Sequence, residues 1–319
     1  MNTADAAGRR LRVGVVGAGG ITHAHVPAWL ELGAECAAFS RSGVAPLVEQ
    51  YGVRSCDTFD ELLRACDIVD ICSPTTTHLG YIEAALRAGR DVICEKPLVR
   101  TASDGARIAA LMDATERHVY PAHVVRWFPE YAAAKAAVED GRIGVPLQVE
   151  LSRIGEFPSW APWFADDEQS GGVVLDLMIH DLDIARWIAG DVVEVRATGE
   201  SGVTASGARH ASAEATLAHA GGAISTVTAR WGEPGIPFRT GVRVVGATAE
   251  VANDAAGDPV AGAGAGTAES PYVAQLRELS AAILGGPEPR VNLADGIRAV
   301  ELAEAVTAAI ATGEAVRLS

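Results

Sequence analysis

The chain has 319 residues, 49% of them hydrophobic, and a formal net charge of −15 at pH 7. This length accommodates two packed domains, and the negative charge argues against binding to a nucleic-acid backbone or an anionic membrane surface. No apolar run approaches the roughly 20 residues of a membrane span, and residues 1–10 lack the apolar segment of a signal peptide. We therefore expect a soluble, cytoplasmic protein.

The five cysteines all lie between residues 36 and 94, and none has the CxxC spacing of a metal or redox motif. Cys36, Cys72 and Cys94 stand in apolar runs that are typical of buried strands. We expect them to be small core side chains in a reducing compartment, and we expect no metal site.

A glycine-rich turn follows the first apolar run. Residues 11–16 predict a strand, Gly17-Ala18-Gly19-Gly20 comes next, and residues 21–32 predict a helix. Strand, glycine turn and helix form the context of a dinucleotide-binding fingerprint, in which the backbone approaches a pyrophosphate at the helix N-terminus. The third glycine position holds Thr22, so the match is partial and a simple tight turn is the alternative. The candidate cofactor-binding residues here are Gly17, Gly19, Gly20 and Ile21.

The next predicted strand, residues 35–39, ends at Ser40-Arg41. An NAD enzyme places an acidic residue for the ribose 2′-OH about 20 residues past the glycines. Serine and arginine at this place would instead accept a 2′-phosphate, which favours NADP over NAD. The alternative is that Arg41 is only a solvated loop charge or stacks on adenine.

Strands and helices continue to alternate as far as residue 125, which predicts a doubly wound parallel sheet of the Rossmann type. The expected strands are 67–73, 91–94 and 118–125, and the expected helices are 58–65, 81–88 and 103–117. Ligands bind such sheets at the carboxyl ends of the strands. The further candidate cofactor-binding residues at that edge are Ser73, Pro74, Thr75, His78, Glu95 and Lys96.

The pattern changes after residue 125, so we predict one domain at 1–125 and a second at 126–319. β-like runs at 147–154, 192–198, 211–218, 223–230 and 239–245 indicate an α+β domain with a mostly antiparallel open sheet. Residues 201–209 and 253–270 read as loops, and helices are expected at 272–284 and 295–312.

Residues 171–187 predict a largely apolar helix, which is expected to be buried. Asp176, His180 and Asp183 fall at i, i+4 and i+7, on one stripe of that helix. A buried polar stripe is either a hydrogen-bonded structural pair or a general base with its orienting carboxylate.

Four stretches stand in order along the chain: Gly17-Ala18-Gly19-Gly20 with His25 downstream, Cys94-Glu95-Lys96-Pro97, Gly171-Gly172, and Asp176-x-x-x-His180-Asp181-x-Asp183. With them the chain resembles the Gfo/Idh/MocA family of NAD(P)-dependent sugar, polyol and inositol oxidoreductases. The resemblance covers nearly the whole chain. Thr22 and Ser40 depart from the family's usual pattern, and Ser40 leaves the preference between NADP and NAD open.

The resemblance implies that Lys96 reaches both the nicotinamide and the substrate hydroxyl, although a structural ion pair with Glu95 is the alternative. It implies that His180 takes the hydroxyl proton and that Asp176 binds substrate or orients His180. Arg126 and Trp163 match positions that line the substrate pocket in relatives, and a packing role is the alternative for both. The resemblance also implies a homodimer or homotetramer.

Two other functions remain open from the sequence. Some relatives have lost catalysis and act as nucleotide- and sugar-sensing regulatory proteins, although Lys96, Asp176 and His180 are all retained here. Other relatives use the bound nicotinamide transiently, with no net change of cofactor.

Overall fold

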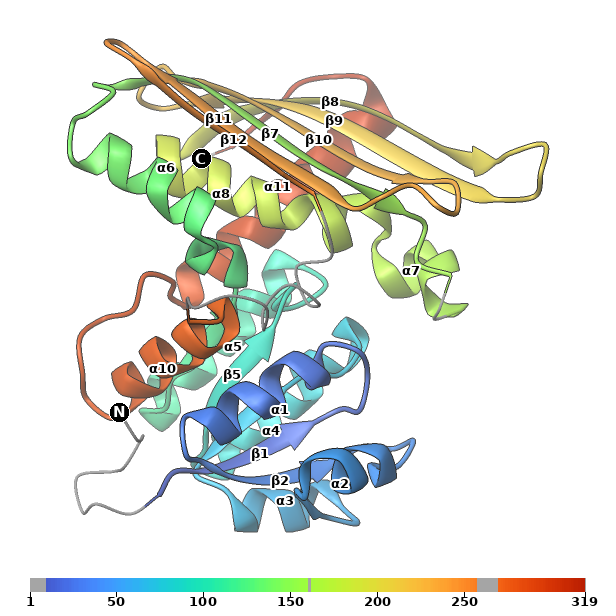
Figure 1. Ribbon diagram of the computed structural model, residues 1–319, viewed down its shortest axis with the longest axis vertical. Helices are drawn as coiled ribbons and strands as arrows, with labels where there is room; N and C mark the ends of the chain where they lie inside the picture. The colour runs from blue at the N-terminus through green and yellow to red at the C-terminus, as the bar shows by residue number, and fades with distance from the viewer. Residues whose placement is uncertain (1–9, 160–161, 257–268, 319) are drawn as a thin grey trace. The chain divides into compact units, whose positions relative to one another are not determined.

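The computed structural model describes residues 10–159, 162–256 and 269–318 (Figure 1). The chain divides into two compact units: Met1–Trp127 with Val260–Ile297, and Phe128–Pro259 with Arg298–Ser319. The predicted second domain, residues 126–319, is therefore not one continuous segment. Helix α10 (Pro271–Ile283) belongs to the first unit because it packs against α1 (Thr22–Glu31), where Tyr272 contacts the ring of His25.

The first unit contains a six-stranded sheet with the order β3-β2-β1-β4-β5-β6. Every neighbouring pair in it is parallel, which confirms the predicted Rossmann-like sheet. The strands are β1 (Arg12–Val16), β2 (Glu35–Phe39), β3 (Arg54–Ser55), β4 (Ile68–Ile71), β5 (Asp91–Glu95) and β6 (Val119–Ala122).

The helices between these strands carry the expected end signals. The Thr58 hydroxyl accepts a hydrogen bond from Glu61 N–H and the Thr101 hydroxyl accepts one from Asp104 N–H, each capping a helix. The sequence did not predict α2 (Ala45–Tyr51), which is followed by Gly52 with a left-handed φ of 69°. The remaining helices of this unit are α2 (Ala45–Tyr51), α3 (Phe59–Ala65), α4 (His78–Arg87) and α5 (Ala102–Thr115).

The second unit contains a seven-stranded sheet with the order β12-β11-β7-β10-β9-β8-β13. Its neighbours are antiparallel except β7 and β10, which confirms a mostly antiparallel sheet. Residues 253–256 were expected in a loop but form the end of β12, and residues 257–268 lie outside the described part. The strands are β7 (Pro146–Glu156), β8 (Val192–Val203), β9 (Arg209–His219), β10 (Ile224–Gly232), β11 (Arg239–Gly246), β12 (Glu250–Ala256) and β13 (Val316–Arg317).

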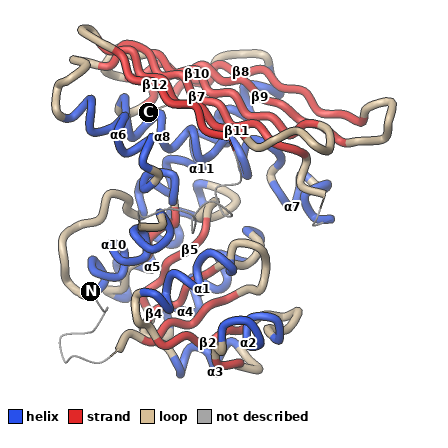
Figure 2. The backbone as a smooth tube through the Cα atoms, in the orientation of Figure 1, coloured by secondary structure: helices blue, strands red, loops and turns tan. Residues whose placement is uncertain are grey.

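Helices cover one face of this sheet, and Figure 2 shows no helix on the other. Burial alternates along the strands. In β9, every second residue from Ala211 to His219 is buried on the face that the helices cover. The helices are α6 (Pro129–Glu139), α7 (Asp167–Ser170), α8 (Ile179–Ala189) and the part of α11 (Leu293–Thr312) that starts at Arg298. Among the described helices, none is long and apolar enough to cross a membrane.

His219 ends β9 and connects three segments of the second unit. Its Nδ1 lies 2.7 Å from the carbonyl oxygen of Gly190, and its Nε2 lies 2.7 Å from the Ser225 hydroxyl. One neutral tautomer satisfies both contacts, with Nδ1 donating to the carbonyl and Nε2 accepting from the hydroxyl. Burial of the ring lowers the pKa of His219.

We expect His219 to make the second unit less stable in mild acid. Because its pKa is lower in the folded protein than the ordinary value of about 6.5, the unfolded chain binds more protons near pH 5–6 and stability falls as the pH drops through that range. Melting temperatures at pH 7.5 and pH 5.5 measure this, and the difference should shrink in His219→Gln. His210→Gln on the same strand is the control. An unchanged pH dependence in His219→Gln would contradict the assignment.

Candidate functional site

The turn between β1 and α1 leaves its backbone open to a ligand. Gly17 has a φ of 117°, and a Cβ there would lie 2.4 Å from the carbonyl oxygen of Cys72, so only glycine fits beside β4. Gly19 and Gly20 are exposed, have no positive φ, and a Cβ on either would meet no atom within 4 Å. The fold therefore requires glycine only at Gly17, while Gly19 and Gly20 allow close approach of a bound group.

Helix α1 begins directly after this turn. Ile21 is its N-cap, no side chain caps it, and its first turn contains no acidic residue. The positive end of the helix dipole therefore faces the glycine turn, and the first turn of the helix carries no acidic side chain, which suits a phosphate-binding loop. Thr22, at the third glycine position, is completely buried at the start of the helix.

Ser40 and Arg41 lie at the carboxyl end of β2. The Ser40 hydroxyl lies 2.9 Å from the Ser42 hydroxyl and accepts a hydrogen bond from Ser42 N–H. Arg41 is exposed and makes no ion pair with any described residue. The position that usually holds an acidic residue is therefore occupied by a hydroxyl next to an unneutralised guanidinium.

His78 joins the ends of β4 and β5. Its Nε2 lies 2.8 Å from the carbonyl oxygen of Ser73, and its Nδ1 lies 2.9 Å from that of Pro97. The ring is 1% exposed, and burial lowers the pKa of His78. This environment favours a structural role for the ring over the predicted direct contact with the cofactor. Of the other predicted residues in this loop, Thr75 is buried, Ser73 is half-buried and Pro74 is exposed.

Lys96 follows the last residue of β5, at the same sheet edge as the glycine turn. The neighbouring Glu95 carboxylate accepts a hydrogen bond from the backbone N–H of Lys96 at 3.1 Å, and its other oxygen lies 3.0 Å from His25 Nε2. Glu95 is 6% exposed. The predicted cofactor contact of Glu95 is therefore less favoured than a role in shaping the Lys96 turn.

The helix that carries Asp176 and His180 is not the regular α-helix that the sequence predicts. Gly171 and Gly172 have left-handed φ values of 79° and 65°. One turn of π-helix, Val174–Met178, follows, and the N–H of Ile179 donates to the carbonyl oxygen of Val174, five residues back. Single π turns occur frequently at functional sites because they widen the helix locally.

Asp176 lies in the π turn and His180 in the first turn of α8, and both are half-buried. Their apolar neighbours are buried, as predicted. Asp183, predicted on the same stripe, is 2% exposed. The second unit thus presents Asp176 and His180 on one helix, whereas Lys96 belongs to the first unit.

A buried ion pair that no sequence pattern predicts fixes this helix to its sheet. Asp181, next to His180, is completely buried and accepts two hydrogen bonds from Arg153 on β7, at 2.9 and 3.1 Å. Arg153 is 4% exposed, and its Nη2 lies 3.3 Å from the Tyr131 hydroxyl. An arginine among the inward-facing positions of β7 was the available signal, but its partner cannot be read from a strand pattern.

Arg126 and Trp163 are each held by packing. Arg126 is 1% exposed, lies 3.2 Å from Asp295 and donates to the carbonyl oxygen of Arg290, all within the first unit. Trp163 stacks on Phe164 with ring centroids 3.8 Å apart. These contacts favour the packing alternative for Arg126, whereas Trp163 is half-buried and keeps part of its surface accessible.

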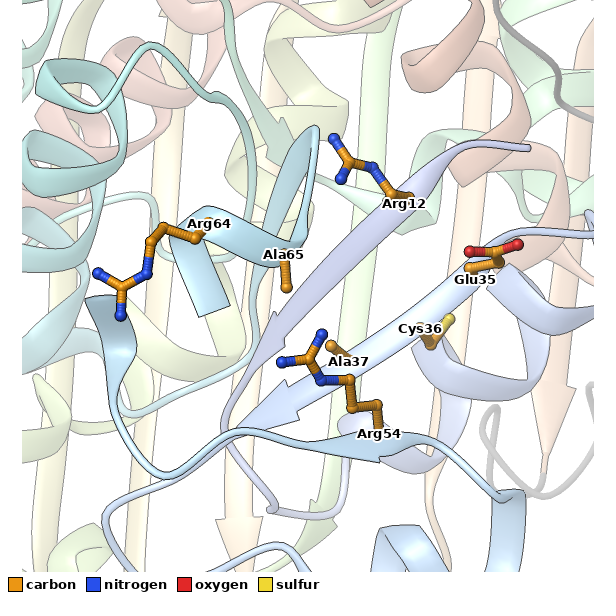
Figure 3. Close-up of a pocket in the computed structure, with 7 residues that line it drawn as sticks. All are labelled: Arg12, Glu35, Cys36, Ala37, Arg54, Arg64 and Ala65. Carbon is orange, nitrogen blue, oxygen red and sulfur yellow. The ribbon is translucent and has the colours of Figure 1, made fainter. Parts of the chain in front are cut away.

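A separate pocket of about 290 Å³ lies at the opposite, amino-terminal edge of the parallel sheet (Figure 3). None of the predicted site residues lines it. Two of its arginines are already paired with carboxylates, Arg12 with Asp67 and Arg54 with Glu61. It is lined by Arg12, Glu35, Cys36, Ala37, Arg54, Arg64 and Ala65.

Two family models match the chain. An oxidoreductase family model with an NAD-binding Rossmann fold matches residues 11–123, and the GFO/IDH/MocA C-terminal domain matches residues 131–252. The inositol 2-dehydrogenase of Rhizobium meliloti is 33% identical over 195 residues, which are 59% of this chain and 58% of that protein. The D-apiose dehydrogenase of Paraburkholderia graminis is 31% identical over 247 residues, 69% of this chain and 60% of that protein. The chain thus spans about three fifths of the length of these two relatives.

A crystal structure of a myo-inositol dehydrogenase from Corynebacterium glutamicum has a TM-score of 0.77 to this chain at 25% identity, covering 97% of this chain and 99% of that one. The parallel sheet with its glycine turn lies in the part matched by the NAD-binding Rossmann model, and strands β7 to β11 of the mostly antiparallel sheet lie in the part matched by the C-terminal domain model. The chain belongs to the Gfo/Idh/MocA family.

Proposed function

We propose that the protein transfers a hydride between a nicotinamide cofactor and a CH–OH group of a sugar, polyol or inositol. The observation that supports this most is the open backbone at Gly19 and Gly20, at the sheet edge where β5 presents Lys96. Glycines that the fold does not need, beside an uncapped helix N-terminus, fit the pyrophosphate of a dinucleotide. The named activities of the two relatives supply the substrate class.

The residue types fit alcohol oxidation, which removes a hydride from carbon and a proton from oxygen. The nicotinamide ring, when bound, supplies the hydride acceptor. Lys96 polarises the substrate hydroxyl and stabilises the alkoxide character that develops in the transition state. His180 accepts the hydroxyl proton, and Asp176 orients His180 or hydrogen-bonds substrate. The same groups run the reverse reduction.

We also propose NADP as the preferred cofactor. Arg41 without an ion-pair partner among the described residues, next to the Ser40 hydroxyl, suits a 2′-phosphate, whereas no carboxylate ends β2 to bind a 2′-hydroxyl. NAD remains the alternative. A homodimer or homotetramer in the cytoplasm stays a prediction from the family resemblance.

A tryptophan-fluorescence titration with NADPH and NADH tests the cofactor assignment. We expect NADPH to bind at least about tenfold more tightly than NADH. Arg41→Ala should remove this difference, because it removes the charge that pairs with the 2′-phosphate. Arg100→Ala, elsewhere in the first unit, is the control. Equal or tighter binding of NADH to the unmodified protein would contradict the NADP assignment.

A screen of sugars, polyols and inositols with the bound cofactor then tests the reaction. Substrate-dependent change in nicotinamide absorbance supports the oxidoreductase. Binding of cofactor and sugar with no turnover would instead favour the regulatory alternative, and failure of both NADPH and NADH to bind would contradict the proposed function.

A further inference from the structure

A histidine that the reaction scheme does not use lies at the centre of a buried polar cluster in the first unit. His25 is on α1, one turn after the glycine loop, and is completely buried. Its Nδ1 lies 2.9 Å from the carboxylate of Asp70 on β4, and its Nε2 lies 3.0 Å from the carboxylate of Glu95 on β5. Trp29, on the same helix, donates to Asp70 at 2.7 Å.

These contacts identify the charge state of the ring. A carboxylate accepts hydrogen bonds and, when ionised, donates none, so a ring nitrogen that faces one must carry a proton. Both nitrogens of His25 face carboxylates, so with both carboxylates ionised the ring is an imidazolium. Burial is the largest single effect and opposes that charge, but the charges of Asp70 and Cys72 and their hydrogen bonds to the ring together outweigh it and raise the pKa of His25 well above its ordinary value. The other titratable groups that face the ring are Cys72 and Tyr272.

The cluster continues to the backbone of Lys96. The oxygen of Glu95 that does not meet His25 accepts the hydrogen bond from Lys96 N–H. The Glu95 carboxylate is thereby held between the imidazolium and the first backbone group beyond β5. Loss of the imidazolium would leave a buried carboxylate without its cation, which is unfavourable, so Glu95 would move or take up a proton.

We propose that His25 is a positioning residue for hydride transfer: as an imidazolium it holds the Glu95 carboxylate, and through Glu95 it holds the turn that aims Lys96 at the reacting hydroxyl. This inference rests on the proposed function of Lys96. It explains physically why a histidine follows the glycine turn and why glutamate precedes Lys96. Catalytic groups must be held within a fraction of an ångström of the productive geometry, and a displacement of about 1 Å costs on the order of 100-fold in rate.

A metal site is the competing reading of the same atoms. Donor atoms of His25, Asp70 and Cys72 all lie within 4.8 Å of one another. The donor atoms are already used within the cluster, since His25 Nδ1 contacts the Asp70 carboxylate and the Cys72 thiol donates to Asp70 Oδ1 at 3.7 Å. The hydrogen-bonded imidazolium satisfies these atoms without an ion.

The test compares His25→Gln and Glu95→Gln with His23→Gln as the matched control. His23 is on the same helix, half-buried, and contacts the Tyr51 hydroxyl at 3.0 Å instead of the cluster. For folded protein with cofactor bound, we expect kcat to fall about 10- to 100-fold in both cluster variants, with the cofactor Kd changed less than about threefold. The control should keep the kcat of the unmodified protein. A role in folding alone would lower the melting temperature of the variant. The kcat and the KM, both measured per folded molecule, would then stay unchanged.

Hydrogen exchange gives a readout that needs no activity. In the holoprotein, exchange of the Lys96 amide should accelerate at least about tenfold in His25→Gln and not in His23→Gln, because its acceptor is displaced. Nitrogen NMR of histidine-labelled protein should show both ring nitrogens of His25 protonated at about pH 8, above the ordinary pKa of about 6.5.

The outcomes separate this inference from the proposed function. An inactive unmodified protein would contradict the function, and exchange and NMR alone would then decide whether His25 holds the turn. Unchanged kcat and unchanged exchange in folded His25→Gln and Glu95→Gln, or stoichiometric bound metal that is lost with His25, would overturn the positioning role. If His25→Gln does not fold, Glu95→Gln, which preserves side-chain shape, carries the test.

Discussion

Replacing Lys96 with methionine is expected to reduce turnover by about 10²- to 10⁴-fold, because the substitution keeps the aliphatic chain and removes the only group proposed to polarise the substrate hydroxyl. The Kd for the cofactor, measured by fluorescence titration, should change little. The melting temperature should also change little, since Lys96 lies half-buried at a loop and not in the core. Initial rates with saturating cofactor and substrate provide the measurement.

The chain offers a natural control, because its only other lysine is Lys135. Lys135 is on α6, where its Nζ lies 3.4 Å from Glu139 and 5.7 Å from the ring centroid of Trp187. Lys135→Met should therefore keep full turnover. A folded Lys96→Met enzyme with a rate comparable to the unmodified protein would exclude the proposed role of Lys96 in the reaction.

The second large effect is expected at the Arg153–Asp181 ion pair. Removing one partner leaves a charge without compensation in the interior, and such changes typically cost about 3–5 kcal/mol of unfolding free energy. We expect Arg153→Met to show this loss in denaturant or thermal unfolding of the second unit. Because Asp181 directly follows His180 on α8, turnover of the remaining folded protein should fall as well.

An ion pair at the end of α8, in which one partner is exposed, provides the comparison. Arg186 Nε lies 2.9 Å from a carboxylate oxygen of Asp191, whose side chain is 73% exposed. Asp191→Asn should change stability by less than about 1 kcal/mol, since water screens an exposed pair. The double variant Arg153→Met with Asp181→Leu should recover much of the loss, because it removes both buried charges. Equal effects of Arg153→Met and Asp191→Asn would contradict the buried ion pair.

The pairs His25–Glu95 and Arg153–Asp181 share a common arrangement beside the two principal candidate catalytic residues. Lys96 is preceded by Glu95, which His25 holds, and His180 is followed by Asp181, which Arg153 holds. In each unit a buried cation fixes a carboxylate that is adjacent in sequence to the residue proposed to act on substrate. Rigid support of this kind maintains the orientation of a reactive side chain.

The amino-acid sequence by itself determined the features that local chemistry controls. Alternating strands and helices predicted the parallel sheet, the glycine turn predicted the open backbone at Gly19 and Gly20, and the helix expected at 58–65 is α3. Each of these depends on residues within one or two turns of chain, where periodicity, capping and φ preference act.

Only the tertiary structure decided which residues pair with the buried charges. It also decided the local conformation where packing outweighs intrinsic propensity. His25 meets Asp70 and Glu95, which are 45 and 70 residues away, and no local pattern specifies such pairs. Residues 253–256 have weak strand propensity and become a strand because β11 provides hydrogen-bond partners. Likewise, the π turn before α8 and the return of α10 to the first unit arise from contacts between distant segments. Backbone polar groups need hydrogen-bond partners and apolar faces need burial, and the folded chain decides which segments provide them.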